Sequence, residues 1–469
     1  MTRYYLNCFH KGLKEFNSIN KVLSNSVVGI SNSYIDDMLR DVSGVSSFSW
    51  EADLLVNIRS RKICQQISKF NEKHENLKRP ILDANTISHC FRQFLRQVYC
   101  KNNFQIFNTI VEYMVLKSSF VLQTLEVDNM ISMVVPHHFG DYIISSVANQ
   151  LGINSTFIEE DIYFEGEGDQ GIFIRSIKDG SYYRIQHNNK RAIKKAVTDL
   201  KTSNGLERYK EDCRKYVQDA RRHSIKGIID SLRSRDGECS LKQINYLKMM
   251  KEYINLNKVS EEYTSKYFIA CLHVEPEATS SPLSFEWINQ MNFIAFVEPI
   301  VKKLGFNVIL REHPHQLTHY WGDFRANCHL YLDEDRAPRS IGRYEELLGL
   351  DGVIGFDKNK SFRSTLNDKN CLGVLSLNGT VLIEGIENKK VVICYKHWIG
   401  SGHKLAVPVD KNMKIKDILS SIEKSLASAS KNEDSIEDII SKYWIRNDMR
   451  DLEGIFFSSE IENIIGTKK

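Results

Sequence analysis

Residues 131–158, ISMVVPHHFGDYIISSVANQLGINSTFI, decide the fold. The apolar run 131–135 predicts a strand that ends at Pro136, and a polar loop separates it from an amphipathic helix predicted over 142–151. Gly152 ends that helix, and a second strand is predicted at 155–158. Strand, helix and strand at this spacing form a βαβ unit, which requires a parallel sheet covered by helices.

The same alternation returns in the second half of the chain. Strands are predicted at 267–274, 308–311, 352–356, 372–377 and 390–395, with helices at 285–304 and 380–386. The sequence therefore predicts the α/β class, with two doubly wound domains in series and a linker around 235–264.

The expected domains are 1–250, with helical insertions, and 265–410, followed by a charged helical tail over 411–469 that packs back on the body. In the first domain a strand is predicted at 27–30, and 51–125 is mostly helical in pattern. Runs 172–177 and 181–185, joined at Asp179-Gly180, predict a β-hairpin.

Composition is that of an ordinary globular chain of 469 residues, 42% hydrophobic and 26% charged, with a formal charge of +4. This near-balance gives no support to wholesale nucleic-acid binding. Ten cysteines are scattered without a CxxC pair, so a reduced, cytoplasmic compartment is expected. The most apolar helix candidate, 106–127, is interrupted by Asn108, Glu112 and Lys117, so no membrane span is expected.

One segment is strongly basic: residues 190–235 hold 14 Lys and Arg against 6 Asp and Glu. A solvated helical face is the simpler interpretation. A patch for anionic headgroups or for an anionic glycan is the functional one. In the second case the protein would touch the inner face of the cytoplasmic membrane peripherally.

Ligands of open parallel sheets bind at the carboxyl ends of the strands, and four loops at such ends carry polar, reactive residues. The first is VVPHHFGD at 134–141. His138 or Asp141 could act as the general base that takes a proton from an acceptor hydroxyl. Asp141 could equally cap the helix that follows.

The second loop follows the strand predicted at 267–274 and holds two carboxylates and three hydroxyls: Glu275, Glu277, Thr279, Ser280 and Ser281. The hydroxyls and nearby amides can donate to a phosphate or a carboxylate. Alternatively, Ser281 starts the next helix. His273 alternates with apolar neighbours, which favours a satisfied core residue over a ligand.

The third loop is REHPHQ at 311–316, where Arg311, Glu312, His313 and Pro314 are consecutive. His313 could place a proton donor against a leaving phosphate while Arg311 neutralises its charge. His313 and His315 lack the usual helical ligand spacing, so no metal is expected here.

The fourth loop, SLNGTVLIEG at 376–385, takes a strand through Asn378, Gly379 and Thr380 into a helix. Backbone amides at a helix start approach a phosphate closely where a glycine leaves room. Glu384 lies one turn beyond Thr380 on the same helix face, where its carboxylate can accept from ribose hydroxyls.

Three segments together resemble the bacterial capsule polysaccharide synthesis glycosyltransferases, the group that includes the Kdo transferases. They are HVEPEATSSP at 273–282, REHPHQ at 311–316 and NGTVLIEGIENKKVVI at 378–393. The PHHFGD loop is a weaker match, and the resemblance covers 130–160 and 265–400. It implies a GT-B architecture of two Rossmann-like domains facing a cleft, the first on the acceptor side and the second holding the nucleotide-sugar donor.

The resemblance also implies roles for individual residues. Glu277, Ser280 and Ser281 would line the donor pocket, His313 would contact the donor phosphate, and Gly379 with Thr380 would cradle phosphate. Glu384 would contact the ribose. The chain departs from the family at Arg311, where lysine is common, at Gly385, where alanine is usual, and at 389–391, which reads Lys-Lys-Val in place of Gly-Lys-Pro.

The resulting expectation is a metal-independent Leloir glycosyltransferase of surface polysaccharide synthesis, acting in the cytoplasm of a bacterium without a cofactor. Its His-Pro pair is similar to that of bacterial GT-B sialyltransferases, which favours a CMP-activated ulosonic acid, Kdo or nonulosonic, as donor. The partners would be this donor and a glycan or lipid-linked glycan acceptor. The alternatives are a transferase that uses a UDP- or GDP-sugar, a nucleotide-sugar epimerase, and a non-catalytic nucleotide-sugar-binding protein.

Overall fold

The structure is a computed structural model. It describes residues 2–7, 13–32, 46–49, 67–69, 72–83, 86–87, 90, 104–136, 139–160, 170–184, 256, 263–273, 285–287, 289–313, 341–357, 361–431, 434–443 and 445–447. The basic segment 190–235 lies outside these residues. The chain divides into two compact units, unit 1 comprising 1–194 with 440–469 and unit 2 comprising 195–439.

The sheet of unit 1 has the strand order β13-β6-β5-β4-β1-β2-β3 among the described residues. Its strands are β1 (Tyr4–Asn7), β2 (Val27–Asn32), β3 (Ser46–Ser49), β4 (Asn129–Ser132), β5 (Asn154–Glu160), β6 (Gln170–Ser176) and β13 (Ile445–Asn447). The five strands from β3 to β5 are parallel, and β6 is antiparallel to both of its neighbours. This part of the sheet is doubly wound, and its strand order reverses between β1 and β4.

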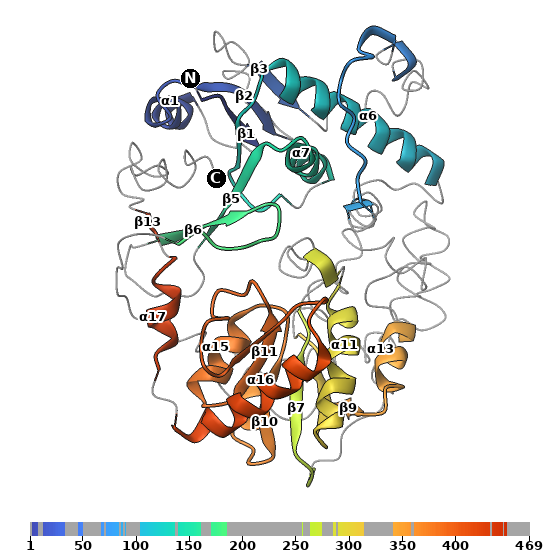
Figure 1. Ribbon diagram of the computed structural model, residues 1–469, viewed down its shortest axis with the longest axis vertical. Helices are drawn as coiled ribbons and strands as arrows, with labels where there is room; N and C mark the ends of the chain where they lie inside the picture. The colour runs from blue at the N-terminus through green and yellow to red at the C-terminus, as the bar shows by residue number, and fades with distance from the viewer. Residues whose placement is uncertain are drawn as a thin grey trace, which may run out of the picture. The chain divides into compact units, whose positions relative to one another are not determined.

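Helices cover both faces of this sheet (Figure 1). On one face α1 (Leu13–Val22) packs its apolar side chains against β1, β2 and β4. On the other face α7 (Phe139–Gln150) packs against β4 and β5, and α6 (Phe104–Thr124) packs on α7. Gly29 in β2 makes room for the ring of Tyr5, because a Cβ there would lie 2.6 Å from Tyr5 Cε2.

The sheet of unit 2 has the order β12-β11-β10-β7-β8-β9, and all of its strands are parallel. They are β7 (Tyr267–Cys271), β8 (Asn307–Arg311), β9 (Val353–Phe356), β10 (Cys371–Leu375), β11 (Val391–Tyr395) and β12 (Ala406–Val409). Numbered within the unit, this is the order 3-2-1-4-5-6 of the Rossmann fold, with its switch point between β7 and β10.

Helices also cover both faces of the second sheet (Figure 1). The main core lies under α11 (Gln290–Lys303), α13 (Ile341–Leu348) and α16 (Ile415–Ser428). On the other face α15 (Thr380–Glu387) packs on β10 and β11, and α14 (Phe362–Leu366) packs on β10. Gly385 allows α15 to lie close to the sheet, because a Cβ there would be 2.7 Å from Val392 Cγ1.

The α/β class and the two doubly wound sheets are confirmed, while several details differ from the sequence expectation. The predicted helix at 285–304 is a 3-10 turn, η1 (Phe285–Trp287), followed by α11, which Asn289 caps. The predicted hairpin is confirmed in part. After the turn at Asp179-Gly180 the chain returns antiparallel to β6, where Tyr182 bridges to Arg175 and the Tyr183 N–H donates to the Ile174 carbonyl at 2.9 Å. Within the described residues 181–184 this arm is a single bridge rather than a strand, and β6 pairs along its length with β5 and β13.

The tail is divided between the two sheets. Helix α16 packs against β11 and β12, and the 3-10 turn η3 (Ala429–Lys431) and the short α17 (Ile436–Ile440) follow it. Strand β13 then pairs with β6 in unit 1. None of the helices within the described ranges has the length and apolar character that crossing a bilayer requires.

Candidate functional site

The switch point of unit 2 gathers a histidine, a serine and the turn that opens α15. His273 follows β7, and its Nε2 lies 3.1 Å from Ser376 Oγ, which follows β10. The Asn378 N–H donates to the same Nε2 at 3.3 Å, and the Ser376 hydroxyl also contacts the Cys271 carbonyl at 2.9 Å. His273 is half-buried. The structure thus joins the loops after β7 and β10 through one imidazole.

Position 379 requires a glycine for two reasons, its backbone conformation and the nearby ring of His273. Its φ is +100°, and a Cβ there would lie only 2.8 Å from His273 Cε1. It precedes α15, for which no side-chain cap is seen within the described part of the chain. Gly379 and Thr380 are half-buried, so this helix start lies at the rim of the sheet.

Gln290, the first residue of α11, fixes the backbone of His273. Its Oε1 accepts the His273 N–H at 2.5 Å, and its Nε2 donates to the His273 carbonyl at 3.1 Å. Gln290 is only 2% exposed. One buried side-chain amide thus binds both the N–H and the carbonyl of His273, which fixes the backbone from which the imidazole extends.

Arg311 ends β8, next to β7 on the same carboxyl edge. Its Nη1 lies 3.0 Å from Asp357 Oδ2, an oxygen that also accepts from the Thr365 hydroxyl at 2.6 Å. Its guanidinium carbon lies 5.8 Å from the ring centre of Phe362. The Arg311 side chain is 16% exposed, so a well-oriented cation reaches the rim.

Glu312 faces inward, whereas His313 stays at the rim. Glu312 is 5% exposed, and it accepts a hydrogen bond from the Tyr344 hydroxyl and another from the His313 N–H at 2.6 Å. One of its oxygens therefore holds the turn, and the other joins the turn to α13. His313 is half-buried, and the buried carboxylate of Glu312 holds its backbone in place.

The predicted site residues in and just before α15 also divide into buried and half-buried ones. Asn378 is 7% exposed and its amide is engaged by His273. Glu384 is half-buried, and its charge contributes to the raised pKa of Cys271, whose main cause is burial. Six predicted site residues lie outside the described residues: His138, Glu275, Glu277, Ser280, Ser281 and Pro314.

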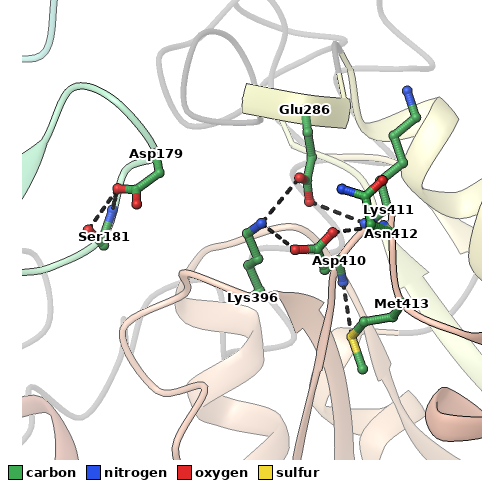
Figure 2. A network of polar contacts seen from close by, with 8 residues as sticks. All are labelled: Asp179, Ser181, Glu286, Lys396, Asp410, Lys411, Asn412 and Met413. Atoms are coloured by element: carbon green, nitrogen blue, oxygen red, sulfur yellow. Dashed lines mark hydrogen bonds and ion pairs between the residues drawn. The ribbon is translucent and has the colours of Figure 1, made fainter. Parts of the chain in front are cut away.

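Three charged residues that the sequence analysis did not single out form a network at the same edge (Figure 2). Lys396, directly after β11, contacts Glu286 Oε2 at 3.3 Å and is also paired with Asp410, directly after β12. Burial acts to lower the pKa of Lys396, but hydrogen bonds and charges from Asp410 and Glu286 outweigh it and raise that pKa. The network joins η1 to the ends of two strands.

Unit 1 also has a polar cluster at its switch point, built around Asn7 at the end of β1. The Asn7 Nδ2 lies 3.2 Å from the Asp141 carbonyl, 3.2 Å from Ser145 Oγ and 3.3 Å from Ser132 Oγ. The Ser31 hydroxyl donates to Asn7 Oδ1 at 2.9 Å. Asn7 and the three serines are 0% exposed, so this cluster is sealed.

Asp141 belongs to this sealed cluster. Helix α7 begins at Phe139, three residues before the predicted start, so Asp141 lies in its first turn. Its exposed fraction is 1%. Burial raises the pKa of Tyr5, and the charge of Asp141 raises it further. A base must lie within hydrogen-bond reach of the proton it takes, and in this conformation Asp141 has almost no surface to offer an acceptor.

The residues that sequence reasoning missed share a simple position. Asn7, Lys396 and Asp410 are each the last residue of a strand or the first after one. The strands of Asn7 and Asp410 were not predicted from the sequence. The strand before Lys396 was predicted, but the residue after its end was not considered. No group of three or more His, Cys, Asp or Glu residues suited to a metal ion occurs among the described residues.

No protein-family model matches the chain, and no curated protein matches it. Among solved structures, the chain is similar to the KpsC beta Kdo 2,7 transferase of Thermosulfurimonas dismutans, with 10% identity, 96% of this chain and 94% of that chain covered, and a TM-score of 0.31. It is also similar to UDP-GlcNAc 2-epimerase of Methanocaldococcus jannaschii, with 12% identity, 94% and 97% covered, and a TM-score of 0.27. The same epimerase in complex with UDP-GlcNAc and UDP has 11% identity, 94% and 98% covered, and a TM-score of 0.24. Similarities this low do not distinguish a transferase from an epimerase, so the strand order and the residues at the sheet edge carry the functional reasoning.

Proposed function

We propose that the chain is a Leloir glycosyltransferase, and that the carboxyl edge of the unit 2 sheet holds the nucleotide of its sugar donor. The observation that carries this proposal is the turn from Ser376 to Thr380 at the switch point of a 3-2-1-4-5-6 sheet. Dinucleotides and nucleotides bind Rossmann sheets at this point, with phosphate at a helix start. Gly379 and Thr380 would hold the donor phosphate.

The neighbouring residues at the rim of the sheet suit the departure of the nucleotide phosphate as the leaving group. In the transfer, the acceptor oxygen bonds to the anomeric carbon, and the bond from that carbon to the donor phosphate oxygen breaks. The negative charge left on the phosphate would be stabilised by Arg311, which Asp357 orients, and by the start of α15. His313 would contact the leaving phosphate, and Glu384 the ribose. The loop with Glu275, Glu277, Ser280 and Ser281 would complete the donor pocket.

The acceptor proton requires a base, and the sequence offers His138 and Asp141 as candidates. Because Asp141 is 1% exposed, its burial supports His138 as the group that accepts the proton, with Asp141 holding the start of α7. The donor would be a CMP-activated ulosonic acid, as the His-Pro pair at 313–314 suggests. The acceptor would be a growing bacterial surface glycan, whose anionic groups the basic segment 190–235 would contact.

A ligand screen followed by a turnover assay tests this proposal. Thermal shift and calorimetry with CMP, UDP and GDP identify the nucleotide, and the matching sugar nucleotide is then incubated with and without a glycan acceptor. Acceptor-dependent release of nucleotide is the expected result. An isomerised sugar nucleotide formed without acceptor would indicate an epimerase instead, and the absence of any nucleotide binding would overturn the proposal.

A further inference from the structure

His273 is held at both its backbone and its ring, by residues from two different parts of unit 2. Its sequence pattern reads as part of a buried strand, yet the residue lies beyond the end of β7 and is half-buried. Its backbone is held by Gln290 on one side, and its ring contacts Ser376, Asn378 and Gly379 on the other. The ring thus bridges two loops that are adjacent at the switch point, although His273 and Ser376 are 103 residues apart in sequence.

The chemistry of this contact defines the state of the ring. A backbone N–H can only donate, so Nε2 must accept from Asn378 and carries a lone pair. In a neutral imidazole the proton then lies on Nδ1. The Ser376 hydroxyl has a single proton, which can serve either the Cys271 carbonyl or Nε2, so Ser376 links the ring to the end of β7 while the Asn378 N–H defines the tautomer.

The shape of the contact defines the turn. Gly379 adopts a φ of +100°, and its α-carbon lies so near the ring that a Cβ would be 2.8 Å from His273 Cε1. The ring therefore acts as a wall against which the glycine lies. The ring engages the Asn378 amide, and the Leu382 amide bonds to the Gly379 carbonyl at 3.3 Å. The amides between them, those of the N-cap Gly379 and of Thr380 and Val381, are therefore the ones at the helix start.

We propose that His273 is a positioning residue for donor binding, which fixes the turn from Asn378 to Thr380 so that the first amides of α15 face the donor phosphate. This inference rests on the proposed function of the same edge. Gln290 supports it by holding the His273 backbone. His273 itself is assigned no contact with the donor and no proton transfer.

The test compares His273→Leu with His273→Gln. The Gln side chain places an oxygen near the position of Nε2 and can accept from Asn378, whereas Leu cannot. In the absence of nucleotide, hydrogen exchange of peptides covering 376–382 should accelerate about tenfold in His273→Leu and stay near wild type in His273→Gln. With CMP and UDP as ligands, His273→Leu should weaken binding of the accepted nucleotide about tenfold and raise the donor KM more than it lowers kcat.

His403→Gln is the matched control, because His403 is a second histidine of unit 2 whose ring is hydrogen-bonded. Its ring contacts the Asp434 carbonyl and the Leu405 amide, away from the turn. This variant should lose stability without changing the nucleotide Kd. If His273→Leu does not fold, His273→Asn replaces it, because the shorter amide does not reach the Asn378 N–H.

The outcomes separate this inference from the proposed function. Unchanged exchange at 376–382 in His273→Leu, or a nucleotide Kd that changes no more than in His403→Gln, overturns the role of His273. If wild type binds neither CMP, UDP nor GDP, the proposed function fails, and the exchange experiment alone decides whether His273 holds the turn.

Discussion

The two switch points of this molecule have the same layout and opposite exposure. In unit 1 a polar residue at the end of the central strand, Asn7, joins the neighbouring strand β4 to the first turn of α7. In unit 2 His273 joins the end of β10 to the start of α15. Asn7 is 0% exposed, whereas His273, Gly379 and Thr380 are half-buried.

This difference shows how one topology serves two purposes. A buried polar cluster whose members satisfy one another stabilises and specifies a fold, because each broken contact leaves a desolvated group. A half-exposed helix start beside a glycine leaves backbone amides within reach of a ligand. We therefore expect damage at the first switch point to appear as lost stability, and damage at the second as lost binding or turnover.

The largest expected effect is on the stability of unit 1. Asn7→Leu should lower the free energy of unfolding by about 3 kcal/mol, because it leaves several buried hydroxyls and a carbonyl without their amide partner. Urea unfolding followed by circular dichroism measures this, with nucleotide affinity as the second readout. Ser118→Ala is the control, since its buried hydroxyl has no hydrogen-bond partner in the described part of the chain. A stable Asn7→Leu protein with weakened nucleotide binding would reverse the comparison.

The next effect is on turnover in unit 2. His313→Ala should reduce kcat about 100-fold, the lower range for loss of an acid–base group, while leaving the unfolding midpoint close to wild type. Initial rates with the donor identified by the screen measure it. The exposed Glu345→Gln serves as a surface control. Normal turnover in His313→Ala would remove its role at the leaving phosphate.

A smaller effect is expected on binding at the turn. Gly379→Ala should weaken the nucleotide Kd about tenfold, because a φ of 100° with a ψ of 169° costs an alanine about 1 to 3 kcal/mol and its Cβ crowds His273. Gly305→Ala is the matched control: its φ is +79°, and nothing lies within 4 Å of its Cβ position. Calorimetry should show weakened binding in Gly379→Ala alone, and equal binding in both would indicate that the turn does not hold the ligand.

The smallest effect concerns a structural histidine of unit 2 and tests pH dependence. Burial lowers the pKa of His403 below its ordinary value of 6.5, although the Asp434 contact opposes this. The unfolded chain therefore takes up the proton first as pH falls. The stabilisation from neutral His403 is present above about pH 6.5 and is lost as pH falls towards the lower folded pKa. Thermal melts between pH 8 and 5 give the Tm of wild type and of His403→Gln at each pH. The Tm of wild type should fall more steeply with falling pH than that of the variant, and parallel plots of Tm against pH would contradict this.

The sequence located the strands that are distinct apolar runs and missed the short central strand of unit 1. β7, β8, β10 and β11 are apolar runs followed by loops or helices with clear patterns, and each was predicted within a few residues. β1, the central strand of unit 1, is only Tyr4–Asn7 and precedes a polar stretch, so it was missed along with Asn7. Its identity as a strand depends on pairing with β2 and β4, which local pattern does not encode.

The sequence by itself determined the α/β class, the βαβ unit at 131–158 and the polar loops after the strands, because periodicity and turn residues act locally. Only the tertiary structure decided which of these loops are neighbours and which are sealed. It gave His273 its partners at 376–379, paired Arg311 with Asp357 and buried Asp141. Strand order and exposure arise from contacts between residues that are distant in the chain, and therefore no local pattern contains them.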